Sequence, residues 1–166
     1  ISNAAFPKGK IPFYAQSSVV VIGRNLAENR LEQVADFINL DLDLRVNTEI
    51  YISDTKASDI ISKDVDLGVL PGETVERIQE IYLENGLMFD VKYYRFINYF
   101  YTDYLAAGVP LLTTEIKNDE GQQEESKSEK EDESPKKTLA YLGTEIIKEK
   151  RASGNLNLEQ TRGALF

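Results

Sequence analysis

The feature that most limits the fold is a stretch of twenty residues, 118–137, that contains no aliphatic or aromatic side chain. Eight acidic residues and four lysines give it −4 of the total charge of −9 (four positive minus eight negative). Such a segment cannot bury enough apolar surface to offset the entropy lost on ordering. Apolar sequence resumes at Thr138, so we expect a disordered acidic insertion at the surface, with an acidic docking tail as the alternative. The core must therefore come from the sequence on either side.

Strand-like and helix-like patterns alternate in those flanking parts. The aliphatic run 19–22, closed by Gly23, is typical of a buried strand, and apolar residues recur at helical spacing after it. The expected elements are strand 19–22, helix 26–40, strand 49–53, a short helix from a cap at Asp54 or Thr55 to Ile61, helices 71–85 and 93–106, strands 111–116 and 139–147, and a last helix capped by Asn157. This order predicts an α/β (α+β) fold, a single domain with a mixed β-sheet packed by helices.

The chain contains neither histidine nor cysteine. Histidine is the usual proton shuttle near neutral pH, and cysteine supplies thiolate nucleophiles, disulfides and soft-metal ligands. Catalytic triads, structural zinc sites and disulfide frameworks are thereby excluded. The sequence favours a binding or assembly module over an enzyme, with no cofactor and no metal.

The charge and hydropathy of the sequence argue against nucleic acid as a partner and against a membrane-spanning segment. A net charge of −9 and a pI near 4.6 argue against nucleic acid, because phosphate-backbone binders need clustered lysine and arginine. No apolar stretch approaches the roughly 20 residues needed to span a bilayer, and no signal peptide is visible. The first residue is Ile1, so we expect a fragment or a processed form.

Two local patterns are weak candidates for ligand sites. The strand–glycine–helix step at Gly23 resembles the entry to a phosphate-binding turn, but neither a three-glycine fingerprint nor a Gly-Lys-Ser/Thr sequence is present. Asp41 and Asp43 place two carboxylates on one side of an extended segment. No calcium-binding loop follows, so we expect these carboxylates to face water.

The segment 93–104 holds seven of the chain's 16 aromatic residues. At helical spacing, one core-like stripe consists of Tyr93, Ile97, Phe100 and Tyr104. The other aromatic residues of the segment are then spread over the remaining faces of the helix: Tyr94, Phe96, Tyr99 and Tyr101. Tyrosine is enriched at protein interfaces because its ring is apolar and its tip is polar. The pattern fits a partner surface, and it also fits simple packing.

Three stretches, in their order and spacing, resemble a known family. They are the strand that ends in Ile22-Gly23, the run Tyr51-Ile52-Ser53-Asp54-Thr55-Lys56-Ala57-Ser58-Asp59-Ile60-Ile61, and the closing Leu158-Glu159-Gln160-Thr161-Arg162-Gly163-Ala164-Leu165. Together they are similar to the N-terminal region of Ger(x)C proteins, the lipoprotein C subunits of spore germinant receptors. The likeness runs from Tyr14 to Phe166, apart from the acidic insertion.

The resemblance implies that residues 1–166 form the N-terminal domain of a germinant-receptor C subunit, with a further C-terminal domain in the same protein. Members of the family are held on the outer face of the spore inner membrane by a lipid on an N-terminal cysteine, a residue absent from this chain. They act with integral-membrane subunits of the same complex in nutrient-triggered germination. They are not known as enzymes, so the resemblance transfers no catalytic residue and no cofactor.

The leading hypothesis is therefore a domain that acts by protein–protein docking. We expect its partner-binding residues to be exposed members of the aromatic helix, Tyr94, Tyr99 and Tyr101, with Arg95 as a polar anchor. Arg162 is a second candidate, because a closing helix would meet the next domain. The alternatives are a nutrient-binding domain with a cleft near the Gly23 turn and, more distantly, a hydrolase that uses two carboxylates.

Overall fold

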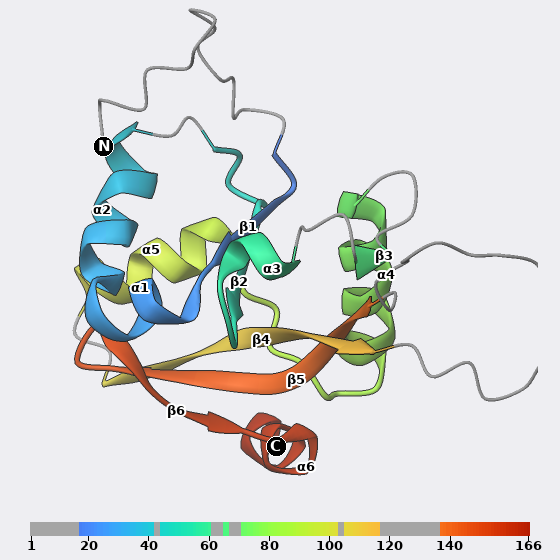
Figure 1. Ribbon diagram of the computed structural model, residues 1–166. Coiled ribbons are helices and arrows are strands. Elements are labelled where there is room, and N and C mark those ends of the chain that lie inside the picture. The colour runs from blue at the N-terminus through green and yellow to red at the C-terminus, as the bar shows by residue number, and fades with distance from the viewer. Residues whose placement is uncertain (1–16, 42–43, 61–64, 67–70, 103–104, 117–136) are drawn as a thin grey trace, which may run out of the picture.

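The computed structural model describes residues 17–41, 44–60, 65–66, 71–102, 105–116 and 137–166 (Figure 1). The acidic insertion predicted over 118–137 lies outside the described residues except for Lys137. That residue is the first of a strand, so the insertion was predicted one residue too long.

Within the described residues, six strands form one mixed sheet. Its order is β1 (Val19–Ile22), β2 (Glu49–Ser53), β4 (Ala106–Ile116), β5 (Lys137–Lys148) and β3 (Val65–Asp66), and β6 (Arg151–Leu156) also pairs with β5. The pairs β1–β2, β2–β4 and β3–β5 are parallel, whereas β4–β5 and β5–β6 are antiparallel. The long strand β5 thus joins the parallel half of the sheet to the C-terminal hairpin.

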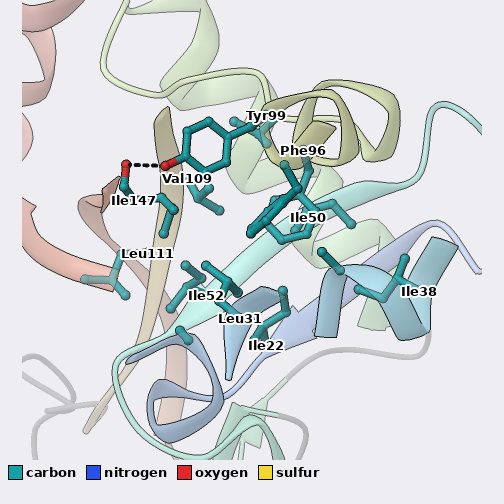
Figure 2. Packing of buried hydrophobic residues seen from close by; sticks show 14 residues of the cluster. Ile22, Leu31, Ile38, Ile50, Ile52, Phe96, Tyr99, Val109, Leu111 and Ile147 are labelled. Carbon is teal, nitrogen blue, oxygen red and sulfur yellow. Dashed lines mark hydrogen bonds between the residues drawn. The ribbon is translucent and has the colours of Figure 1, made fainter. Parts of the chain in front are cut away.

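Helices cover both faces of this sheet. The first face, called the α5 face, is covered by α1 (Arg24–Asn29), α2 (Leu31–Asp41) and α5 (Tyr93–Tyr101). The opposite face, called the α4 face, is covered by α3 (Ala57–Ile60), α4 (Pro71–Glu84) and α6 (Leu158–Leu165). Each face has its own cluster of buried side chains, and the larger one lies on the α5 face (Figure 2). The predicted α+β fold, with a mixed sheet packed by helices in a single domain, is confirmed.

Two of the expected helices differ in extent from the structure. The helix expected over 26–40 is two helices, α1 and α2, separated at Arg30, which leaves the helical backbone region at φ −145° and ψ 27°. The helix expected to end at Ala106 ends at Tyr101, and Ala106 instead begins β4. Long-range pairing explains the second error, because β4 pairs with β5 over its whole length and overrides the local helical pattern.

Strands β3 and β6 were not predicted. The turn between β5 and β6 consists of Glu149 and Lys150, both with positive φ (52° and 60°). This is the backbone of a tight hairpin turn, for which sequences usually supply Asn-Gly or Asp-Gly. Because two long charged residues occupy the turn, the sequence carries no local sign of the hairpin.

A bulge in β5 depends on glycine. The pairing of β4 with β5 shifts after Leu111, and Gly143 opposite it has a φ of 141°. A Cβ atom at this position would lie 2.0 Å from the carbonyl oxygen of Leu156. Gly143 therefore allows β5 and the end of β6 to approach closely, which positions α6 on the sheet.

Candidate functional site

The inner face of α5 is part of the core. Phe96, Tyr99 and Phe100 are at most 5% exposed, and the ring centres of Phe96 and Tyr99 each lie 5.1 Å from that of Phe100. The Tyr99 hydroxyl donates a hydrogen bond of 3.3 Å to the backbone oxygen of Ile147 in β5, as Figure 2 shows. The prediction that Tyr99 is exposed is therefore wrong. Tyr99 lies on the same side of the helix as Phe96 and Phe100, the side that faces the sheet.

The outer face of α5 carries Tyr94 and Tyr101, which are 48% and 57% exposed as predicted. Arg95 lies beside Tyr94, where its Nε donates to the tyrosine hydroxyl at 2.9 Å and its guanidinium carbon lies 5.7 Å from the ring centre. Arg95 Nη1 also donates to the backbone oxygen of Asp90 at 2.8 Å. The structure thus brings Tyr94 and Arg95 together as one amphipathic surface element.

Helix α5 is fixed to α2 by two side-chain hydrogen bonds. The Tyr101 hydroxyl donates to Asp36 Oδ1 at 2.8 Å, and the Tyr93 hydroxyl donates to Asn39 Oδ1 at 3.0 Å. The bond to Asp36 raises the pKa of Tyr101. These contacts and the buried inner face fix the orientation of α5, which lies beside α2 (Figure 1).

Exposed apolar residues extend this surface beyond α5. Leu40, at the end of α2, is 77% exposed, and Val46 is 68% exposed. The backbone oxygen of Val46 accepts a hydrogen bond from the Tyr94 backbone at 3.5 Å. We call Tyr94, Arg95, Tyr101, Leu40 and Val46 the α2–α5 surface. Its mix of exposed tyrosine, arginine and aliphatic groups is the composition enriched in protein interfaces.

Arg162 lies elsewhere. Helix α6 begins at a complete capping box, in which the Asn157 side chain and the Gln160 side chain each accept from the other's backbone N–H, and the predicted cap is confirmed. Thr161 is fully buried and its hydroxyl donates to Thr144 Oγ1 at 3.1 Å, which fixes α6 to β5. Arg162 next to it is exposed. Because α6 packs on the α4 face, Arg162 does not join the α2–α5 surface.

The Gly23 turn carries an ion pair that the sequence did not reveal. Arg24 Nη1 binds Glu145 Oε2, and Arg24 Nε donates to Glu28 Oε1 at 2.7 Å. The Glu145 side chain is fully buried, and its other oxygen accepts from the Gly154 backbone at 3.2 Å. Burial raises the pKa of Glu145, although Arg24 opposes that shift. Arg24 and Glu145 are 121 residues apart, so only the folded chain brings them together.

Glycine at position 23 has a steric reason. Arg24 N donates to the Thr55 backbone oxygen at 2.8 Å, and a Cβ on Gly23 would lie 3.1 Å from the Ala57 nitrogen. The turn therefore packs directly against the start of α3. An open hollow of about 430 Å³ lies beside it, lined by Arg24, Glu28 and residues 151–154. The nutrient-binding cleft expected near Gly23 stays a prediction, and the Arg24 guanidinium in this hollow is already bound by two carboxylates.

The predicted Asp41–Asp43 pair lies outside the described residues, which include neither Asp43 nor the Asp41 side chain. Within the described ranges, no group of three or more acidic side chains could hold a metal ion. In the same part of the chain, no helix has both the length and the apolar character needed to cross a membrane.

Comparison with known proteins identifies the family. The family described as "Spore germination protein N-terminal domain" matches residues 1–114, which include two of the three stretches that carry the resemblance. The crystal structure of the GerBC protein is similar with a TM-score of 0.45 and 18% identity, over 92% of this chain and 37% of that one. The chain thus spans well under half the length of that protein, and no curated protein matches it. Because the family match spans 114 of 166 residues, the chain belongs to the spore germination protein N-terminal domain family.

Proposed function

We propose that this chain is the N-terminal domain of a C subunit in a spore germinant receptor and that it acts by docking, without turning over a substrate. Family membership supports the role in germination. The absence of histidine and cysteine from the sequence supports a role in contact over one in catalysis.

The observation that carries the docking proposal is the α2–α5 surface. Tyr94 and Tyr101 are exposed on a helix whose other side is buried and whose ends are bonded to neighbouring segments. Interface residues that are already held in place lose less conformational entropy on binding. Tyrosine and arginine are also the residue types that most often dominate binding energy.

The proposed partners are the integral-membrane subunits of the same receptor. Arg162 is the proposed contact to a further C-terminal domain of the same protein, on the opposite side of the sheet from α5. The proposed location is the outer face of the spore inner membrane, with the membrane reached only through a lipid anchor outside this chain. Neither nucleic acid nor a cofactor has a part in this proposal, since the net charge of −9 disfavours the first.

The test replaces Tyr94 and Tyr101 with serine in the intact subunit. Both side chains are exposed, and the double variant removes only the exposed Tyr101–Asp36 hydrogen bond, so it should keep most of its thermal stability and lose co-purification with the other receptor subunits. Germination in response to nutrients should fall with it. The matched control is Ile81→Ser, an equally exposed apolar residue on α4. A stable Tyr94→Ser/Tyr101→Ser variant that assembles and germinates as the wild type would refute the docking surface.

A further inference from the structure

Helix α4 is followed by Asn85-Gly86, the only asparagine–glycine dipeptide in the sequence. Asn85 is exposed, and Gly86 has a φ of 62°, the left-handed conformation that commonly ends a helix. Because glycine has no side chain, its backbone nitrogen reaches the side-chain carbonyl carbon of a preceding asparagine with little steric hindrance. The residue pair that ends α4 is therefore also the most chemically reactive asparagine sequence in the chain.

Two hydrogen bonds hold the groups that would react. The Asn85 side-chain nitrogen donates to the Ile81 backbone oxygen at 2.6 Å, and the Gly86 backbone nitrogen donates to the Leu83 oxygen at 3.0 Å. Attack requires a rotated Asn85 side chain and a free Gly86 nitrogen, so both bonds must open first. They belong to the end of a helix, which frays more readily than its middle.

We propose that Asn85 is a site of spontaneous deamidation, which takes place when the end of α4 frays. The Gly86 nitrogen loses its proton to solvent base and bonds to Asn85 Cγ. The side-chain nitrogen takes up a proton and leaves as ammonia, and a cyclic succinimide remains. Water then opens the ring at either carbonyl, which gives aspartate or isoaspartate at position 85. The net reaction exchanges ammonia for water and needs neither an oxidant nor a cofactor.

Both products weaken the end of α4. Aspartate cannot donate to the Ile81 oxygen, and its charge lies at the negative end of the helix dipole, where the last turn has no basic residue. Isoaspartate lengthens the backbone, which disrupts the hydrogen bond of 2.9 Å from the Leu87 nitrogen to the Tyr82 oxygen. The Leu87 oxygen accepts from the Tyr141 hydroxyl at 3.1 Å, so the change also reaches the buried cluster of the α4 face.

The other asparagines of the described residues are less reactive. Each is followed by a residue with a side chain, as in Asn98-Tyr99 and Asn155-Leu156, and these two asparagines lie inside α5 and β6. The proposal is independent of the docking role, because Asn85 is not part of the α2–α5 surface.

Peptide mapping of the 166-residue chain after incubation in mildly alkaline buffer tests the proposal. The tryptic peptide 78–92 should show the mass change of an amide-to-acid exchange at Asn85, and isoaspartyl methyltransferase should label the same peptide. In the folded chain, Asn85 should react before every other asparagine of the described residues, and it should react faster in urea, where α4 is unfolded. Earlier reaction of another of these asparagines overturns the proposal. An intact Asn85 in the folded chain, after complete reaction in urea, also overturns it.

Three variants test the chemistry and its effect on α4. Asn85→Gln moves the amide one carbon further from the Gly86 nitrogen, so position 85 should stay unmodified. Asn85→Asp reproduces one product and should lower Tm by about 2–4 °C. The control is Asn25→Asp, the same exchange at an exposed residue in the first turn of α1, where negative charge is favourable and Tm should not fall. Reaction of Asn85→Gln at the wild-type rate, or an equal change of Tm in Asn85→Asp and Asn25→Asp, would contradict the proposal.

Discussion

The two faces of the sheet are packed by different means. On the α5 face the buried cluster is aliphatic and aromatic, and its fully buried charge, Glu145, is paired with Arg24. On the α4 face two buried tyrosines replace part of the hydrocarbon, and the Tyr51 hydroxyl has no partner among the described residues. The comparison teaches that the Glu145 carboxylate and the Tyr99 hydroxyl on the α5 face both have partners, whereas on the α4 face the Tyr141 hydroxyl is hydrogen-bonded and the Tyr51 hydroxyl is not. A helix on the first face is better suited to present side chains in a fixed orientation.

The largest expected effect tests the packing of the α5 face. Phe96→Ala should lower the free energy of unfolding by about 3–5 kcal/mol, because Phe96 is 2% exposed and its removal leaves a cavity against Phe100. Urea unfolding measures the loss. Tyr94→Ala on the outer side of the same helix should change stability by less than about 1 kcal/mol. Similar losses in free energy of unfolding for the two variants would contradict the division of α5 into a buried side and an exposed side.

The second prediction concerns the ion pair on the α5 face. Glu145→Ala removes a fully buried carboxylate that binds Arg24 and the Gly154 backbone, and should destabilise the protein by about 1–3 kcal/mol. The loss stays below that of a completely buried pair because Arg24 is 30% exposed. Glu28→Ala, which removes the exposed partner of Arg24, should cost less than about 1 kcal/mol. If chemical denaturation shows a larger loss in free energy of unfolding for Glu28→Ala than for Glu145→Ala, the buried carboxylate does not stabilise this turn.

A pair of substitutions on the α4 face tests whether its two buried tyrosine hydroxyls differ in hydrogen bonding. The Tyr141 hydroxyl donates to the Leu87 backbone oxygen at 3.1 Å and lies 3.2 Å from Thr144 Oγ1, so Tyr141→Phe should cost about 0.5–1.5 kcal/mol. Tyr51→Phe removes a buried hydroxyl without a partner among the described residues and should be neutral or stabilising. The two free energies of unfolding form a matched comparison. Equal destabilisation by both variants would mean that the Tyr51 hydroxyl is satisfied.

The smallest expected effect is a change in the pH dependence of stability. Burial raises the pKa of Glu49, and Asp90 and Glu76 add to the shift while a hydrogen bond with Gln79 opposes it. The folded state then holds this proton more tightly than the unfolded state, so stability falls as pH rises from the ordinary pKa of glutamate through the raised one. Glu49→Gln should flatten that slope in thermal melts across the acidic range. If stability changes with pH equally in Glu49→Gln and in the wild type, this assignment to Glu49 is contradicted.

The sequence predicted the elements that have local signals. The aliphatic run before Gly23 and the Asn157 cap are local patterns, and both lie where they were expected. Strand β6 was missed because its turn uses Glu149 and Lys150 without the usual glycine. Helix α5 was predicted too long because β4 begins where it pairs with β5, and β5 lies far along the chain.

The site was predictable only in part, for the same physical reason. Tyr94 and Tyr101 are exposed as expected, but the buried stripe contains Phe96, Tyr99 and Phe100, a spacing as helical as the one chosen from the sequence. Nothing local distinguishes these two stripes, since the packing partner Ile147 is 48 residues away from Tyr99. The Arg24–Glu145 pair had no sequence signal at all.

The most direct test of the docking account is site-specific photocrosslinking in the full-length protein in spore membranes. A photoreactive phenylalanine analogue at Tyr101 or at Tyr94 should crosslink to another receptor subunit, because both side chains project from the α2–α5 surface. The same analogue at Ile81 on α4 should not. Crosslinks from Ile81 and none from Tyr94 or Tyr101 would contradict the account.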